Sequence, residues 1–322
     1  MASGTSRVST YTAASSAFYQ SSLISTGVQR ETLGDRLNQT RTWIYNHGQG
    51  TVMGRTPIDW LLLIGCNVAF LVGLLAMTSA FCGILYWLVG WNYPKLRGAA
   101  SILQTPGIGF RPQPNIETTL IRFIKGDYNT YIHYLDHIEA YIQYYENELQ
   151  QGDNFMDCSE IRTRRTTNLN KVCVFDPIVL GGDCVKQQNY GFDDGQPCIL
   201  LKLNKVFDWQ PEEYTNETVP NIIKNVWSED SPWWVFVRCD GDNHITRENM
   251  GDLVYFPPEQ GFHFKYFPFR NQQGYRSPLM FLRFQNPHPG ILLMMTCRAF
   301  AKNIIHDHVE VVGEVHFEVL ID

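Results

Sequence analysis

Residues 60–91 read WLLLIGCNVAFLVGLLAMTSAFCGILYWLVGW and contain no Asp, Glu, Lys or Arg. A helix of this length reaches about 48 Å, which exceeds the hydrocarbon core of a bilayer, about 30 Å thick. Trp60 at one end and Trp87 and Trp91 at the other are placed where aromatic side chains line the membrane interface. A buried core helix seldom runs so long without a charge. We therefore expect a tilted transmembrane helix over residues 60–91.

No second stretch of this kind occurs in the 322 residues, which predicts a single-pass protein. Residues 1–40 are rich in Ser, Thr, Ala and Gly without hydrophobic period, so we expect a disordered tail there, followed by a juxtamembrane segment over 41–59. The tail has no basic region leading into an early apolar run, so the span is expected to act as an uncleaved signal anchor. Residues 92–322 suffice for one domain with its own core.

Net charge and composition narrow the class of partner. A net charge of −6 and a pI near 5.8 argue against nucleic acid as the main partner. An aromatic content of 13% suits a β-rich domain or a large binding surface.

Cysteine usage indicates the orientation, because the charges flanking the span do not decide it. Two cysteines lie in the span, and an even set of six lies beyond it: Cys158, Cys173, Cys184, Cys198, Cys239 and Cys297. Such a set suggests disulfides, which persist outside the cytosol, and no CxxC pair favours zinc instead. A glycosylation sequon at Asn216 points the same way. We expect type II topology, with the tail cytoplasmic and residues 92–322 extracellular.

The region beyond the span reads as one helix followed by strands. Apolar residues recur at helical spacing from Asn115, a plausible cap, to Leu149, with a break at Gly126-Asp127. Apolar or alternating runs predict strands over 199–207, 233–239, 262–269, 279–285, 291–300 and 309–321. Several strands separated by turn residues suggest a β-sandwich with a helical insertion.

Catalytic and metal sites have weak support. His133 and His137 stand one helical turn apart, but no third zinc ligand is identifiable, so a solvated helix face is the better interpretation. Asp240-Gly241-Asp242 could hold a divalent ion and a nucleotide sugar, as in a Golgi glycosyltransferase, yet Asp-Gly after a strand more often forms a hairpin turn. No phosphate loop or nucleophile elbow is present. We predict no catalytic residue, no metal and no cofactor.

Two features predict contacts with another protein. Small residues recur on one side of the span, at Gly65, Ala69, Gly73, Ala76, Ala80 and Gly83. Such a face lets another helix approach closely, although Gly and Ala are frequent in membrane helices generally. Asn67 is the only amide in the span and is able to bond across to a partner. Phe262, Phe264 and Tyr266 fall on one side of the strand predicted over 262–269, with Phe267 and Phe269 on the other. This strand is either central or docks a partner.

The segment before the span carries a family resemblance. Trp43, Tyr45, Asn46, Met53, Gly54, Arg55, Thr56 and Trp60 follow the signature of the beta subunits of the sodium/potassium- and proton/potassium-transporting P-type ATPases. The likeness continues at Phe110-Arg111-Pro112, 190–206, 266–269, 296–304 and the last strand. This chain departs from the pattern at Thr40, where the family has an aromatic residue, and at Val185-Lys186. The aromatic residues that the family has near Asn67 and Leu71 are also missing, so details of the contact with the catalytic subunit are expected to differ.

The resemblance implies an immunoglobulin-like external domain and sequential disulfides, Cys158 with Cys173, Cys184 with Cys198, and Cys239 with Cys297. It also implies a non-catalytic plasma-membrane subunit that assists folding, membrane delivery and stability of the catalytic alpha subunit and modulates potassium affinity. The resemblance also implies two further partners, a small third regulatory subunit and the lipid bilayer. Tyr266, Phe267, Pro268 and Phe269 match a region that lies near the catalytic subunit's external loop. Alternatives are a proton/potassium pump subunit or an adhesion protein acting without a pump.

Overall fold

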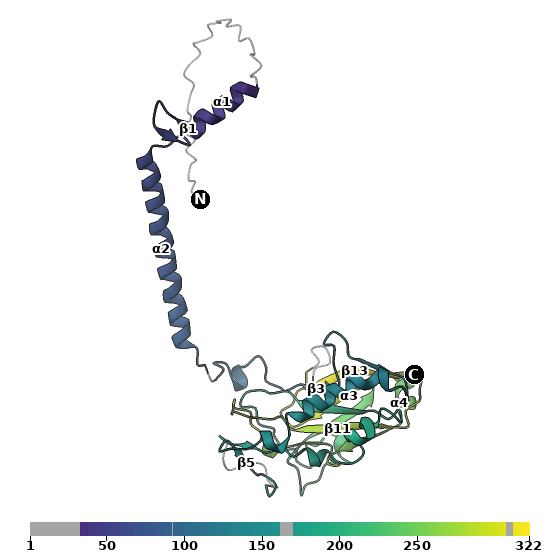
Figure 1. Ribbon diagram of the computed structural model, residues 1–322. Coiled ribbons are helices and arrows are strands. Elements are labelled where there is room, and N and C mark those ends of the chain that lie inside the picture. Colours follow the sequence, from purple (N-terminus) through teal and green to yellow (C-terminus); the bar gives the residue numbers. More distant parts are fainter. Residues whose placement is uncertain (1–32, 92, 162–169, 307–311) are drawn as a thin grey trace, which may run out of the picture. The chain divides into compact units, whose positions relative to one another are not determined.

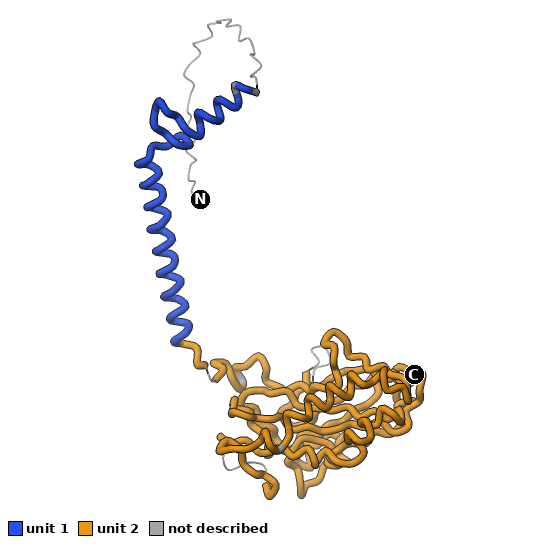
Figure 2. The backbone as a smooth tube through the Cα atoms, in the orientation of Figure 1, with its two compact units in different colours: residues 1–87 blue, residues 88–322 orange. Residues whose placement is uncertain are grey.

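The computed structural model describes residues 33–91, 93–161, 170–306 and 312–322. It divides into two units, residues 1–87 and 88–322 (Figure 2). Of the tail predicted over 1–40, residues 1–32 lie outside the described part. The prediction was wrong for residues 33–40, which belong to helix α1 (Leu33–Ile44). Leu37 and Ile44 recur at helical spacing there, a local signal that the Ser- and Thr-rich composition obscured.

The first unit continues from α1 into a two-stranded hairpin, β1 (Tyr45–Asn46) and β2 (Thr51–Val52), and then into α2 (Pro57–Leu88) (Figure 1). Among the described residues, α2 is the one helix long and apolar enough to cross a membrane. It begins and ends three residues earlier than the predicted span.

Local capping explains why α2 begins at Pro57. Thr56 Oγ1 accepts the backbone N–H of Asp59 at 3.3 Å, and Asp59 Oδ2 accepts the Thr56 N–H at 3.1 Å. This reciprocal pair is a capping box, and proline is favoured at the first helical position because its missing N–H is not needed there. The Thr-Pro-x-Asp signal was present in the sequence, although hydropathy alone placed the start at Trp60.

The second unit contains two main β-sheets. The five-stranded sheet has the order β10-β8-β12-β13-β4, and the four-stranded sheet has the order β3-β7-β11-β9. Neighbours are antiparallel except β13 and β4, which are parallel. The strands are β3 (Ile108–Arg111), β4 (Leu120–Phe123), β7 (Cys198–Leu203), β8 (Trp234–Gly241), β9 (Asp252–Phe256), β10 (Gly261–His263), β11 (Leu279–Gln285), β12 (Leu292–Phe300) and β13 (Glu314–Ile321).

One hydrophobic core is shared by both sheets. Val237 and Cys297 of the larger sheet and Leu201 and Phe281 of the smaller belong to the same buried cluster. Strands β12 and β13 alternate between buried and half-buried residues, as expected when one face packs on a core. Residues 292–300 and 314–321 therefore fit the alternation that the sequence predicted. The predicted start of the last strand, Val309 to Val311, lies outside the described residues.

The helix that contributes to this core is shorter than predicted. Helix α3 (Tyr128–Gln143) begins at the expected break, where the Asp127 carboxylate accepts the backbone N–H of Asn129. The prediction of Asn115 as a cap was wrong, because the residues that follow it include strand β4, which pairs with β13. That pairing joins segments about 200 residues apart, so no local pattern announced it.

Two further short-range predictions were wrong. The strand over 262–269 ends at His263 and continues as a 3₁₀ turn, Phe264–Tyr266, so the predicted two-sided strand does not exist. Asp240 and Gly241 do not form a hairpin turn, because β8 runs through them and pairs with β12. A short helix, α4 (His244–Asn249), follows. Its Thr246 occupies the space beside Gly241 that a Cβ atom would need.

Candidate functional site

The motif before α2 forms a compact helix start. Gly54 has φ = +75°, a conformation that favours glycine. Thr56 caps the helix, and Trp60 Nε1 donates a hydrogen bond of 2.9 Å to the carbonyl of Val52 in the hairpin. Backbone bonds of 2.9 and 3.1 Å join Val52 and Arg55 in both directions. Of the four residues Gly54, Arg55, Thr56 and Trp60, each thus has a local structural role, Arg55 through its backbone alone, because its side chain is exposed.

The small-residue face of α2 is uncovered within its own unit. No residue of α2 is buried, and Cβ atoms added at Gly65, Gly73 and Gly83 would meet nothing within 4 Å. Asn67 donates from Nδ2 to the carbonyl of Leu63 at 2.8 Å, within its own helix. The predicted small residues therefore all lie on α2, and no other part of the described chain covers the three glycines.

The aromatic segment 266–269 divides into buried and half-exposed side chains. Phe267 is 8% exposed and packs edge-on against Trp209, with ring centres 5.5 Å apart, and Pro268 is also buried. Tyr266 and Phe269 are half-buried. Phe267 and Pro268 therefore hold the segment on the domain, and Tyr266 and Phe269 are the pair that another molecule could touch.

A cationic and aromatic cluster surrounds Phe269. Lys205 Nζ lies 5.3 Å from the ring centres of both Phe269 and Tyr275. Phe207 contacts Phe269 on one side and Tyr93, in the segment that follows α2, on the other. Burial, with the nearby charges of Lys202 and Arg276, lowers the pKa of Lys205. Sequence reasoning missed this cluster because its members come from four separate segments.

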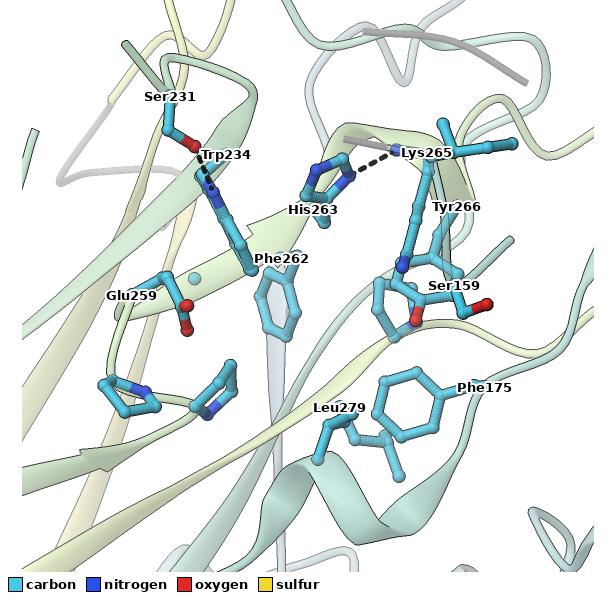
Figure 3. Close-up of a pocket in the computed structure, with 16 residues that line it drawn as sticks. Ser159, Phe175, Ser231, Trp234, Glu259, Phe262, His263, Lys265, Tyr266 and Leu279 are labelled. Carbon is cyan, nitrogen blue, oxygen red and sulfur yellow. Dashed lines mark hydrogen bonds between the residues drawn. The ribbon is translucent and has the colours of Figure 1, made fainter. Parts of the chain in front are cut away.

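A cavity of about 540 Å³ opens beside Tyr266 (Figure 3). Trp234, Phe262 and His263 line it together with Glu259 and Lys265. His263 Nδ1 accepts the backbone N–H of Lys265 at 3.0 Å, and burial together with the charge of Lys265 lowers the pKa of His263 to about 4. The imidazole is therefore neutral at physiological pH. It caps the 3₁₀ turn, so its position here indicates a structural role.

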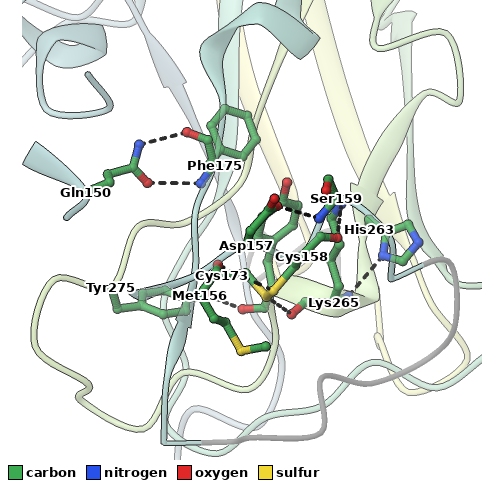
Figure 4. Close-up of a disulfide and its surroundings, with 11 residues drawn as sticks. Gln150, Met156, Asp157, Cys158, Ser159, Cys173, Phe175, His263, Lys265 and Tyr275 are labelled. Carbon is green, nitrogen blue, oxygen red and sulfur yellow. Dashed lines mark hydrogen bonds between the residues drawn. A yellow bond between two sulfur atoms is a disulfide. The ribbon is translucent and has the colours of Figure 1, made fainter. Parts of the chain in front are cut away.

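The lysine in this turn also contacts a disulfide loop (Figure 4). Lys265 Nζ donates to the carbonyl of Cys158 at 3.1 Å, and Cys173 Sγ lies 3.3 Å from the carbonyl oxygen of Lys265. Burial lowers the pKa of the Lys265 ammonium. The Cys158–Cys173 disulfide therefore contacts the residue that precedes Tyr266, which ties the aromatic segment to a distant part of the chain.

All six cysteines beyond α2 form disulfides in the sequential pairing that the resemblance implies: Cys158–Cys173, Cys184–Cys198 and Cys239–Cys297. The first two close short loops, whereas the third joins directly opposed residues of β8 and β12. Cys66 and Cys82 in α2 are free and exposed.

The sequon at Asn216 lies in an exposed turn. Thr218 Oγ1 accepts the backbone N–H of Thr215 at 2.9 Å, which closes the turn and leaves Asn216 at its surface. An enzyme acting on the exposed asparagine would have access to it.

The weaker candidates have structural partners of their own. His137 Nδ1 accepts the backbone N–H of Gln113 at 3.1 Å, and the His133 ring contacts Tyr134. Asp240 pairs with Arg247 at 3.3 Å, and Asp242 with His316 at 2.8 Å. Within the part of the chain that the structure describes, no three His, Cys, Asp or Glu residues are grouped as metal ligands.

Fold and sites together define a class of protein, in which, among the described residues, one candidate membrane-spanning helix precedes a mainly β domain held by disulfides. Comparison with known sequences narrows this class. The family described as the sodium/potassium ATPase beta chain matches residues 30–317. The protein therefore belongs to the sodium/potassium ATPase beta chain family, which confirms the resemblance seen in the sequence.

Individual relatives agree with that membership. The chain is 33% identical over 298 residues to sodium/potassium-transporting ATPase subunit beta-2 of Drosophila melanogaster, an alignment that covers 87% of this chain and 90% of that protein. It is 34% identical over 297 residues to subunit beta-1 of the same organism, covering 87% and 91%. It is 28% identical over 286 residues to a probable subunit beta-3 of Caenorhabditis briggsae, covering 88% and 86%.

Proposed function

We propose that this protein is the non-catalytic beta subunit of a sodium/potassium-transporting ATPase. It assists folding, membrane delivery and stability of the catalytic alpha subunit, and it modulates potassium affinity. The observation that carries the proposal is the family match over residues 30–317, which includes both the helix start and the β domain. The relatives reported above are all named for the sodium/potassium pump, which favours this pump over a proton/potassium pump.

Two surfaces are proposed to contact the alpha subunit. In the membrane, the face from Gly65 to Gly83 admits a neighbouring helix at short distance, because small side chains let backbones approach. Outside it, Phe269 offers aromatic area beside the Lys205 ammonium and Tyr266 beside that of Lys265, and aromatic residues are enriched at the centres of interfaces. Phe267 and Pro268 act indirectly, by holding these two side chains in place. A small regulatory subunit is a further proposed partner.

The decisive experiment is co-purification of the full chain with a sodium/potassium pump alpha subunit. Phe269→Ala and Gly73→Leu are expected to reduce the recovered complex, with the β domain still folded by its disulfide pattern. Leu75→Phe, on the other side of α2, serves as the matched control and should leave recovery unchanged. A chain that purifies alone, reaches the cell surface without an alpha subunit and leaves pump abundance unaltered on removal would overturn the proposal and favour pump-independent adhesion.

We further propose type II topology in the plasma membrane, with an immunoglobulin-like external domain. Two sheets around one core support that architecture. The Cys239–Cys297 disulfide, however, joins neighbouring strands of one sheet, unlike the inter-sheet disulfide of antibody domains.

Two sequons on opposite sides of α2 test the orientation. Asn38-Gln39-Thr40 precedes the helix and Asn216-Glu217-Thr218 follows it, and both asparagines are exposed. Type II topology predicts that Asn216→Gln abolishes a glycosidase-sensitive shift in electrophoretic mobility, whereas Asn38→Gln changes nothing. The reverse pattern would show that the chain is inserted the other way round.

A further inference from the structure

Helix α1 has an apolar side that is exposed in its own unit. Leu37 and Ile44 are two turns apart on one side and are 66% and 50% exposed, and Trp43, about 100° from Ile44 around the helix, is 57% exposed. Thr40 lies between them, and its hydroxyl donates to the carbonyl of Arg36 in the preceding turn. This side therefore shows methyl groups, with its hydroxyl group already bonded.

The other side of α1 is polar, and arginines border the apolar side. At 100° per residue, Asn38, Gln39 and Thr42 lie about 100° to 160° from Leu37, while Arg36 and Arg41 lie about 100° and 40° from it on its two sides. Between residues 33 and 56 the sequence holds three arginines against one aspartate. An apolar face bordered by arginines is the pattern of helices that lie in the headgroup layer of a membrane.

The hairpin places this face beside the start of α2. The backbone N–H of Met53 donates to the carbonyl of Ile44, the last residue of α1, at 3.0 Å. Pro57, where α2 begins, follows four residues after Met53, a covalent reach of at most about 14 Å. The end of α1 is thus held close to the point where α2 begins.

Exposed apolar residues also lie in the chain between the two helices. Tyr45 in the hairpin and Met53 just after it are 54% and 47% exposed, and Ile58 in the first turn of α2 is 76% exposed. The apolar side of α1 is thus followed by further exposed apolar residues and by a helix apolar enough to face lipid. An apolar side near the start of such a helix, with arginines at its border, fits acidic phospholipid headgroups.

We propose that α1 and the hairpin dock on the membrane surface, with Leu37 and Ile44 in the headgroup layer. Arg41 and Arg55 bind the phosphate and carboxylate groups of acidic phospholipids. Docking makes the position of α1 and the hairpin sensitive to the lipid composition of the membrane. The proposal does not depend on which pump the chain joins. A helix of twelve residues is marginal in water, so its order reports on docking.

The test uses the full chain in nanodiscs of phosphatidylcholine, with or without phosphatidylserine, and follows hydrogen exchange over residues 36–44. We expect protection in the membranes that contain phosphatidylserine, reduced by about 25-fold in Arg41→Gln with Arg55→Gln, since each arginine near an anionic surface contributes about fivefold. Raised salt should act in the same direction. Leu37→Gln should abolish the protection, whereas Asn38→Gln, on the polar side, should retain it.

A depth measurement distinguishes lipid from protein as the occupant. In a Cys66→Ala, Cys82→Ala background, a fluorescent label at Leu37→Cys should be quenched by lipids that carry a quencher in the headgroup region, and a label at Asn38→Cys much less. Equal quenching at both positions, or exchange that ignores phosphatidylserine, would overturn the proposal. Protection that requires a co-reconstituted alpha subunit would also overturn it, because the apolar face would then be a protein interface.

Discussion

The helix start at residues 53–60 and the aromatic segment 266–269, with the turn that leads into it, are both short and contain aromatic side chains. They form for different reasons. The first is held by partners within eight residues, such as Thr56 with Asp59 and Trp60 with Val52. The second is held by partners far away in the chain, such as Trp209 against Phe267 and the Cys158 carbonyl on Lys265. Local contacts survive loss of the domain, whereas distant contacts exist only when the domain is folded.

The largest expected effect comes from removing the disulfide with the longest loop. Cys239→Ala with Cys297→Ala should lower the free energy of unfolding of the β domain by about 4 kcal/mol, because the unfolded chain regains the entropy of a loop closed over a separation of 58 residues. Denaturant unfolding in detergent measures the change. Cys66→Ala with Cys82→Ala removes two free cysteines of α2 and should leave this value unchanged. Equal losses from both pairs would contradict the separation of the two regions.

The next effect is a pH dependence at His263. Its pKa is about 4 in the folded domain and about 6.5 when unfolded, so the unfolded state binds more protons between these values. The free energy of unfolding should therefore fall as the pH falls from about 6.5 to about 4, by about 3 kcal/mol in all. Chemical denaturation across this range measures it. His263→Asn keeps a cap acceptor for the Lys265 N–H and should remove this part of the dependence; an unchanged pH profile would show that His263 is not its origin.

The smallest effect is expected at the helix start. Thr56→Ala removes the hydroxyl that accepts the Asp59 N–H, which should cost about 1 kcal/mol locally. Hydrogen exchange at the amides of Asp59 and Trp60 should become about fivefold faster, while the β domain is unaffected. Thr56→Ser keeps the hydroxyl and should behave like the natural chain. A change in β-domain unfolding would show that the two regions are energetically coupled after all.

Sequence reasoning located the long helix, the alternating strands and the family, because each depends on residues that are contiguous in the chain. It placed the aromatic segment on a strand, because a run of aromatic residues in a chain resembles a strand pattern. Only the packed domain shows that Phe264 to Tyr266 form a 3₁₀ turn and that Phe267 is buried. The cluster of Lys205 with Phe269 and Tyr275 had no sequence signal, because Lys205 is more than 60 residues away from the two rings in the chain.

The sequence by itself determined which segment can cross a membrane. A long apolar run without charges is suited to lipid over its whole length, and this does not depend on the rest of the fold. It also determined that six cysteines were available for pairing, and the family pattern implied the order. Tertiary structure alone decided which aromatic residues are available to a partner. Exposure of a side chain depends on neighbours that come from distant segments. Only folding places β4 beside β13 and Cys158 beside Lys265.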